Sequence, residues 1–565
     1  MDIVKRLVHR WPLMLIALVC GVLAAMVDAL KDEDKLVFSL IYLFHALIYT
    51  LAFCVLAKIG ESVLAWLGRD REISASSVGS KGKRWFTYES TATQLCLVAA
   101  VMFLCWVPYL VITYPGVLWY DTQQQLLQWF KLPNLFNDGS HLSDHHPVLD
   151  TAIYGLFVDL GNLLGSGDFG LFLLSLLQAL VMAFSLSAVV LYCRHIGLTR
   201  RFCVAILAFF ALFPIVPVYT ITLAKDSLFL PFCIWFSLVF IETARSKGQV
   251  LKRPLILAIF IASALLMAFT KKTGVYIVLL SCVLLLFFLP RKGRMRTGCV
   301  ALVTLLVMAL FNGVVLPAAH IAPSGKQEML ANAFQQSALV MKRRGNEIPK
   351  DDRKVLDAML GHNAGDRYAW GTVDPVKGFS WSARQNDDLS AYLKVWAKEA
   401  FQFPGTYLEA YLSLQRGWIG VPDARDGNNT GDLLMTVQAQ DVGHVFKGSE
   451  KFGLSALGHG GLRVKLENAV RWFAGSPFGM LIFARAFWAL WLVVFVLYEC
   501  LRRENGHVAW LLVYLVTFLT LWISPISANN EAMRYLITMV FLAPLALAAT
   551  IAPNSSATRD AEACA

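Results

Sequence analysis

The chain has 565 residues, of which 57% are hydrophobic and only 16% are charged, and its mean hydropathy is +0.57. About a quarter of the residues of a soluble protein are charged, so this composition excludes a soluble protein and predicts one embedded in a membrane. The formal net charge is +11, but Lys and Arg gather in short gaps between apolar runs. The excess therefore indicates membrane orientation and excludes nucleic acid as the expected partner.

Apolar runs long enough to cross a bilayer recur along the chain, and they predict about twelve transmembrane helices. In chain order the runs are 12–28, 36–57, 92–113, 168–193, 202–222, 227–243, 254–270, 274–290, 297–318, 477–500, 508–526 and 533–551. The first run follows a basic start and lacks a small-residue cleavage site, so we interpret it as a retained span. The run 149–164 is short and carries Asp150 and Asp159, which predicts an interfacial or re-entrant helix.

Basic residues lie in the gaps that this span pattern places on one side of the membrane. With the N-terminus in the cytoplasm, these gaps all fall inside; they hold Lys5, Arg6, Arg10, Lys81, Lys83, Arg84, Arg200, Arg201, Lys252, Arg253, Arg291, Lys292, Arg294, Arg296, Arg502 and Arg503. The acidic gap 31–35, the polar loops 114–148 and 319–476 and the turn 529–531 fall outside. We therefore expect both termini in the cytoplasm and any water-soluble chemistry at the outer face.

The same pattern divides an all-α polytopic membrane protein into four parts. Residues 1–91 form an N-terminal two-span region with a cytoplasmic linker, and residues 92–318 form a membrane core with the outer loop 114–148. Residues 319–476 form an extracytoplasmic, mainly helical domain between the ninth and tenth spans, since this segment is too long for a passive loop. Residues 477–565 form a C-terminal three-span region. The eleven cysteines lie outside both long polar loops, so no disulfide framework is predicted.

The outer loop 114–148 carries a carboxylate, Asp121, shortly after the third predicted span. Asp121 or Thr122 is placed to cap the helix that the following glutamines begin. Asp121 is also a candidate general base, because partial desolvation at a membrane surface raises a carboxyl pKa toward neutral pH. The two roles are compatible.

Two histidines follow in the same loop, as Asp144-His145-His146-Pro147. Imidazole and carboxylate are common metal ligands, so a divalent metal site is one interpretation. Adjacent side chains in an extended segment point apart, however, which weakens that interpretation. The alternatives are contact with a phosphate or an acceptor, and plain loop polarity with Pro147 starting a helix.

Charged residues also occupy two very short outer turns. Lys225 and Asp226 lie between the fifth and sixth spans, where ionisable residues are often functional, or they balance each other. Lys271 and Lys272 lie between the seventh and eighth spans, against the positive-inside trend. They are candidates to bind a phosphate, and snorkelling of their side chains to the interface is the alternative.

Two arginines complete the set of candidates on the outer side. Arg534 opens the last span, three residues after Glu531, with which it can pair on one helical face. Arg416 follows an aromatic amphipathic segment of the extracytoplasmic domain and is a candidate to reach a ligand near the membrane. His459 of the same domain is a weaker candidate.

The order of these motifs resembles that of the GT-C fold, the multi-pass glycosyltransferases that use polyprenyl-phosphate-linked sugars. The residues that carry the resemblance are Pro115-Gly116, Asp121, Gln125, His146-Pro147 and Lys225-Asp226, within residues 90–320. The pattern is also similar to bacterial GT-C-like membrane families. The resemblance implies that Asp121 is the catalytic carboxylate that activates the acceptor. It also implies that the cations stabilise the leaving polyprenyl phosphate.

The expected function is therefore inverting transfer of a sugar from a polyprenyl-phosphate-linked donor to a cell-envelope acceptor, at the outer face of the bacterial cytoplasmic membrane. The expected substrate-binding residues are His145, His146, Lys225, Asp226, Lys271, Lys272, Arg416 and Arg534. The partners are the lipid-linked donor, the acceptor and membrane lipids. No cofactor is expected besides the donor, and a divalent metal stays an option.

Two other functions fit parts of the sequence. An oligosaccharide ligase or polymerase of the O-antigen type also has a long, late outer loop, and Arg416 and His459 would then matter more than Asp121. A transporter or flippase of lipid-linked substrates is the third interpretation. The predicted spans hold few ionisable residues and show no internal repeat, and both observations weigh against transport.

Overall fold

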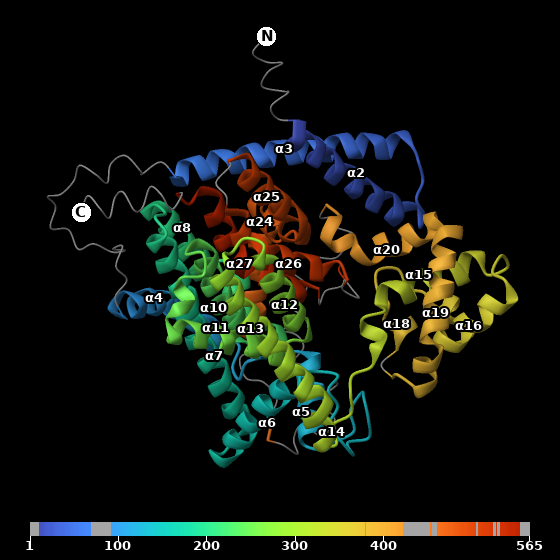
Figure 1. Ribbon diagram of the computed structural model, residues 1–565, viewed down its shortest axis with the longest axis horizontal. Helices are drawn as coiled ribbons and strands as arrows, with labels where there is room; N and C mark the ends of the chain where they lie inside the picture. Colours follow the sequence, from blue (N-terminus) through green and yellow to red (C-terminus); the bar gives the residue numbers. More distant parts are fainter. Residues whose placement is uncertain are drawn as a thin grey trace, which may run out of the picture.

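The computed structural model describes residues 11–68, 92–378, 380–421, 453–454, 460–503, 507–523, 527 and 532–553. Throughout these residues the fold is helical, apart from one pair of two-residue strands. Figure 1 shows a helical hairpin of α2 and α3 along one edge, a central bundle of helices, and a group of helices from α15 to α20 at one side. The protein is thus an all-α, multi-pass membrane protein, as its composition predicts.

The N-terminal hairpin and the bundle contain the apolar helices. Their bounds are α2 Trp11–Glu33, α3 Leu40–Gly68, α4 Ala92–Ile112, α7 Gly167–His195, α8 Arg200–Leu212, α9 Ile215–Ile221, α10 Lys225–Arg245, α11 Pro254–Thr270, α12 Lys272–Leu286, α13 Arg291–Leu310, α24 Pro477–Ile482, α25 Leu492–Arg502, α26 Leu512–Leu521 and α27 Met533–Ile551. Short irregular turns of helix join some of them: η2 Val250–Lys252, the π-helices η3 Phe311–Val315 and η7 Phe487–Trp491, α14 Leu316–Ala318 and η8 His507–Leu511.

Seven of the described helices are long and apolar enough to cross a membrane, namely α2, α3, α4, α7, α10, the run from α13 to α14, and α27. The pair α8 and α9 makes an eighth candidate that is bent by 57°. The other predicted spans correspond to shorter apolar helices, α11, α12 and η8 with α26, or to the interrupted segment from α24 to α25. The total of twelve spans therefore stays a prediction.

Helices α7, α10 and α27 form the centre of the bundle. In the most apolar window of each, 61%, 78% and 83% of the residues are buried, whereas the same share is 17% in α3 and 22% in α13. Many large apolar side chains of α3 and α13 are exposed, among them Leu51 and Leu305, so these stretches are suited to face lipid. Lys225 and Asp226 begin α10, and Arg534 lies in the first turn of α27, so the first turns of two central helices supply charged residues of the site.

Two short helices and two short strands form connections at one end of the bundle. α5 spans Tyr120–Trp129 and α6 spans Val148–Leu163. The strands β1 (Val117–Leu118) and β2 (Thr222–Leu223) are parallel. Gln178 of α7 secures the second strand, because its side-chain amide donates hydrogen bonds of 2.8 Å to the carbonyls of Thr220 and Thr222. Two connections that are about 100 residues apart in sequence are thereby held side by side.

The helices from α15 to α20 have a hydrophobic core of their own. Their bounds are η4 Lys326–Glu328, α15 Ala331–Arg344, α16 Lys350–Leu360, α17 Ala364–Arg367, α18 Asp374–Lys377, α19 Ala383–Gln402 and α20 Pro404–Ile419. Ser382 and Gln385 form a capping box at the start of α19. The later helix α23 (Gly460–Ala474) packs on the bundle instead, with Val470 in the bundle core. The described part of the predicted outer domain is thus helical, and its boundary at residue 476 stays a prediction.

The hairpin of α2 and α3 connects the bundle to this outer group of helices. Its tip contacts α15 and α20: Arg343 pairs with Glu409 and Asp34, and the backbone N–H of Leu36 donates to Glu409 at 2.8 Å. Along its length the hairpin also meets the bundle, since a side chain at Gly60 would collide with the Phe495 ring. The acidic gap 31–35 and the outer helices therefore lie together, as the charge pattern predicts.

Contacts between connections show which of them lie at the same end of the bundle. Two basic gaps meet where Gly248 lies against Gly293, and two polar loops meet where the Asp144 N–H donates to Ala322 at 2.8 Å. The predicted division into two sides is consistent with these contacts. Which side faces the cytoplasm stays a prediction.

Helices α6 and α7 cross closely at Gly170, which allows a stability test. A Cβ atom on Gly170 would lie 1.9 Å from the carbonyl oxygen of Phe157, so Gly170→Ala is expected to destabilise the protein by about 1–3 kcal/mol. In the control, Gly298→Ala, the Cβ atom would meet no atom within 4 Å, and helix propensity favours the change by roughly 0.5–1 kcal/mol. Thermal midpoints in detergent measure both effects. Equal midpoints for the two variants would contradict the close crossing.

Candidate functional site

Asp121 lies in the first turn of α5, at one end of the bundle. The N-cap residue is Trp119, and no side chain caps this helix. The Thr122 hydroxyl instead donates to the Leu223 carbonyl at 2.5 Å and so joins α5 to the strand β2. The predicted capping role of Asp121 or Thr122 is therefore wrong, because both side chains point to partners outside their own helix.

Two cations contact the same oxygen of Asp121. Lys225 Nζ donates to Asp121 Oδ2 at 2.9 Å, and Arg534 Nη1 donates to it at 2.5 Å. His146 Nδ1 lies 3.1 Å from Lys225 Nζ and 3.9 Å from Asp121 Oδ2. Because the ammonium group is a donor, His146 Nδ1 is the acceptor of this bond. We call these four residues, Asp121, His146, Lys225 and Arg534, the Asp121 cluster.

The Asp121 cluster is largely shielded from solvent. The side chains of Arg534 and His146 are 6% and 5% exposed, and those of Asp121 and Lys225 are 13% and 18% exposed. The guanidinium of Arg534 also lies 5.4 Å from the Trp119 ring and 5.0 Å from the Tyr535 ring. Aromatic faces stabilise a cation of this kind, so Arg534 is held in place from several directions.

Burial and charge act in opposite directions on Asp121. Burial raises its carboxyl pKa, but Arg534, then Lys225 and His146, lower it, and the net pKa lies well below its ordinary value. The expectation that desolvation brings this pKa toward neutral pH is therefore wrong for the paired state. Burial and the charge of Lys225 likewise lower the pKa of His146 well below its ordinary value, which keeps the ring neutral.

A second ion pair lies next to the Asp121 cluster. Lys271 Nζ is 2.7 Å from Asp226 Oδ1, and their side chains are 12% and 1% exposed. Lys271 also lies over the Phe229 ring at 5.4 Å. The alternative that Lys225 and Asp226 balance each other is wrong, since each pairs with a different residue. The alternative that Lys271 snorkels to the interface is wrong as well, because its ammonium group is buried against a carboxylate.

The remaining candidates of the loop form a third group. Lys272 Nζ lies 3.1 Å from Asp144 Oδ2 and also contacts the Asp144 carbonyl. The His145 ring stacks on Phe136 with 4.3 Å between centroids, and it is perpendicular to the His146 ring. Burial, Lys225 and Lys272 lower the pKa of His145 to about 3. Burial raises the pKa of Asp144, although Lys272 opposes that effect.

A metal ion finds no ready ligand set in this loop. Within the part of the chain that the structure describes, no three His, Cys, Asp or Glu residues are grouped to hold a metal. His146 Nδ1 faces the Lys225 ammonium, and Asp144 faces Lys272. These side chains are engaged with cations of the protein itself.

Arg416 belongs to a different neighbourhood. Its guanidinium lies 3.6 Å from the centroid of the Trp370 ring, and the next residue, Gly417, donates its N–H to Ser527 at 2.8 Å. Arg416 thus packs on Trp370, and its predicted role in substrate binding stays a prediction. The proposed partner Glu531 and the weaker candidate His459 lie outside the described residues.

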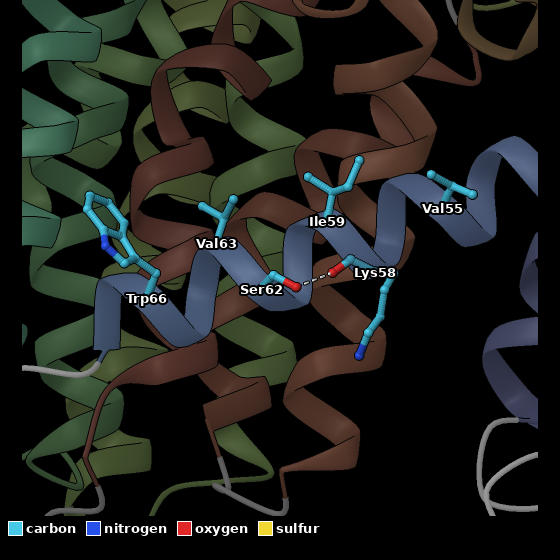
Figure 2. Close-up of a pocket in the computed structure, with 6 residues that line it drawn as sticks. All are labelled: Val55, Lys58, Ile59, Ser62, Val63 and Trp66. Atoms are coloured by element: carbon cyan, nitrogen blue, oxygen red, sulfur yellow. Dashed lines mark hydrogen bonds between the residues drawn. The ribbon is translucent and has the colours of Figure 1, made fainter. Parts of the chain in front are cut away.

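The hollow in Figure 2 lies apart from these charged groups. It has a volume of about 440 Å³, and all six lining residues come from the single helix α3. Val55, Ile59, Val63 and Trp66 are exposed along it, and Ser62 Oγ donates to the Lys58 carbonyl of its own helix at 2.9 Å. An apolar stripe on a candidate span suits lipid contact, so we assign this hollow no chemistry.

Two candidate functional residues were not among those predicted from the sequence. Trp119 supplies the ring beneath Arg534, and Asp150 lies fully buried in α6. A signal for Asp150 was present in the sequence, because an acid inside an apolar run is costly and marks a candidate site. The partner of Trp119 depends on the position of α27, which no local pattern reveals.

The pair of Lys271 and Asp226 gives a stability prediction. Lys271→Met is expected to destabilise the protein by about 3–5 kcal/mol, because Asp226 would stay buried without its cation. Adding Asp226→Asn is expected to restore much of the loss. Lys354→Met is the control, since Lys354 and its partner Asp351 are 78% and 93% exposed and such pairs contribute little. Thermal midpoints in detergent measure all three variants, and a single variant as stable as the double one would contradict the pairing.

The fold and the Asp121 cluster define a multi-pass helical membrane protein with a shielded, ion-paired site at one end of its bundle. Residues 133–563 match the family described as "Family of unknown function (DUF6020)", and the chain belongs to this family. The matched residues include His146, Lys225 and Arg534, and they begin after Asp121. No curated protein and no solved structure matches the chain.

Proposed function

We propose that this protein is a membrane glycosyltransferase that moves a sugar from a polyprenyl-phosphate-linked donor to a cell-envelope acceptor, at the outer face of the bacterial cytoplasmic membrane. One observation carries the proposal: Asp121 meets Lys225 and Arg534, from three separate connections, at one end of a bundle of apolar helices. A lipid tail suits the bundle, an anionic phosphate suits the cations, and a carboxylate suits the activation of an acceptor hydroxyl.

Donor binding would rearrange the ion pairs of the Asp121 cluster. The phosphodiester of the donor is an anion and competes with the Asp121 carboxylate for Arg534 and Lys225. Once these cations face the phosphate, the charges that lower the Asp121 pKa are weakened, while burial still raises it. Asp121 then becomes a stronger base at the moment when the donor is in place.

The proposed reaction is a single displacement with inversion. The acceptor oxygen forms a bond to the anomeric carbon, and the bond from that carbon to the phosphate oxygen breaks with its electron pair left on the phosphate. The acceptor proton moves to Asp121. Negative charge grows on the leaving phosphate, and Arg534 and Lys225 stabilise that charge. His146, which is neutral, orients the Lys225 ammonium through its Nδ1 atom.

The proposal is tested with purified protein in detergent, a polyprenyl-phosphate-linked sugar and a mixture of envelope acceptors, with and without a chelator. The expected result is a covalent glycosylated product with the configuration at the anomeric carbon inverted. Movement of the donor across vesicle membranes without a covalent product would instead support transport. Loss of turnover in Arg416→Gln with full turnover in Asp121→Asn would support the ligase or polymerase.

A further inference from the structure

Asp150 is a fully buried carboxyl group in the first turn of α6. Neither of its oxygens has a hydrogen-bond partner among the described residues. The amide nitrogen of the nearby Gln125 is engaged elsewhere, since it donates to the Thr151 hydroxyl at 3.1 Å and contacts the Pro147 carbonyl at 3.5 Å. A buried carboxylate without hydrogen-bond partners is very unfavourable. Asp150 is therefore expected either to carry a proton or to gain an ion-pair partner when it loses that proton.

The charges around Asp150 come from several elements. Lys225 and Asp226 face it from α10, and Asp144 faces it from the loop before α6. Tyr154 lies one turn further along α6, within reach of the charges of both Asp150 and Asp121. Lys271, at the end of α11, forms an ion pair with Asp226. The acid in the first turn of α7, Asp168, lies at the opposite end of α6.

Lys225 is the cation that acts on both Asp150 and Asp121. Burial raises the pKa of Asp150 well above its ordinary value; Lys225 lowers it, and Asp226 and Asp144 raise it. Burial without a hydrogen-bond partner in the described part of the chain favours the protonated form of Asp150, and a neutral Asp150 leaves Lys225 able to pair with Asp121. An ionised Asp150 would attract the same ammonium group, because its own oxygens have no other partner among the described residues.

We propose that Asp150 is a proton-holding positioning residue of this site: its neutral form leaves Lys225 to Asp121 and to an incoming lipid phosphodiester, and its ionised form draws Lys225 away from both. The inference rests on the proposed function, since it assumes that a phosphodiester binds at the Asp121 cluster. It adds Asp150, a second carboxyl group on a different helix from Asp121. The protonation of Asp150 sets how much positive charge the site offers to the phosphodiester of the donor.

The first test measures the proton directly and needs no ligand. The difference between infrared spectra of the detergent-solubilised wild-type protein and of Asp150→Asn is expected to contain a carbonyl band of a protonated carboxyl at neutral pH. Glu399, whose pKa burial raises to about 7, contributes equally to both proteins and cancels. The control is Asp159→Asn on the same helix, whose carboxylate accepts from Trp129 Nε1 at 2.9 Å; this variant is expected to keep the band. The band is expected to disappear as the pH is raised further and Asp150 loses its proton.

The second test measures binding of farnesyl methyl phosphodiester, because a diester keeps one negative charge throughout the titration, whereas a phosphate monoester has a second pKa near about 6. The Kd of the wild-type protein is expected to rise about tenfold, or about 1.4 kcal/mol, as the infrared band disappears. Asp150→Asn is expected to keep a nearly constant Kd over the same range, and Asp159→Asn is expected to follow the wild type.

The outcomes separate the two proposals. Binding with the same pH dependence in the wild type and in Asp150→Asn would overturn the role of Asp150 and leave the proposed function standing. A band that is missing at neutral pH would overturn it as well. An absence of binding at every pH, with the band present in the wild-type protein, would overturn the proposed phosphodiester site.

Discussion

Asp121→Asn is expected to reduce sugar transfer by about 10²- to 10⁴-fold, the range that general-base catalysis contributes, while binding of a lipid phosphodiester becomes tighter. The two effects have one cause. The carboxylate is the proposed base, and it also competes with the donor phosphate for Lys225 and Arg534. A neutral amide removes the base and removes the competitor.

Slower sugar transfer together with tighter phosphodiester binding is a more specific expectation than a loss of activity alone. Turnover is measured with saturating donor, and binding is measured with farnesyl methyl phosphodiester. The control is Asp138→Asn, an exposed carboxylate of the same loop, which is expected to behave as the wild type in both assays. Wild-type turnover by a well-folded Asp121→Asn protein would contradict the base assignment. Weaker binding by that variant would contradict the competition between carboxylate and phosphate.

Arg534→Gln is expected to reduce kcat by about 10²- to 10³-fold, as removal of a transition-state charge partner does elsewhere. Arg534 is proposed to act on charge that grows on the leaving phosphate, so the loss should appear in kcat as well as in kcat/KM. Arg534 is also the largest of the influences that lower the Asp121 pKa. Without it, Asp121 keeps a proton to higher pH, and the acidic limb of the activity profile should move to higher pH.

A pH profile of kcat/KM for the wild type and for Arg534→Gln measures both consequences. Arg344→Gln is a suitable control, because that arginine forms an ion pair with Glu347 in which both side chains are more than half exposed. An increase in KM with an unchanged kcat would show that Arg534 contributes only to donor binding. An acidic limb that stays in place would show that Arg534 does not set the protonation of Asp121 during turnover.

Apolar runs alone predicted most of the helical segments, because crossing a bilayer demands long apolar sequences. The run 533–551 coincides with α27, and 92–113 nearly coincides with α4 at Ala92–Ile112. The breaks inside runs were not predictable in the same way. The bend of 57° between α8 and α9 lies at Pro214, and proline is a residue that kinks or ends a helix. The π-helix Phe487–Trp491 interrupts another run. These breaks are the reason why some runs are not single long helices.

Topology was sufficient to bring the candidate residues together, and it was insufficient to pair them. The sequence placed Asp121, Lys225 and Arg534 on one side of the membrane, and the structure joins them at one carboxylate. The pairing of Asp226 with Lys271, and not with its neighbour Lys225, depends on how α10 and α11 are tilted. The sign of the Asp121 pKa shift depends on how many cations reach one oxygen atom, and sequence spacing carries no such information.

The separation of Asp121 from Arg534, 413 residues along the chain, has a consequence for biosynthesis. During translation, Asp121 enters the membrane long before its strongest counter-charge has been made. Until α27 inserts beside α10, the site contains Asp121 and Lys225 but lacks Arg534. The last helix therefore completes the site as well as the bundle, and a polypeptide that ends before α27 has neither. Synthesis through α27 is thus the step that first assembles the charged centre of this protein.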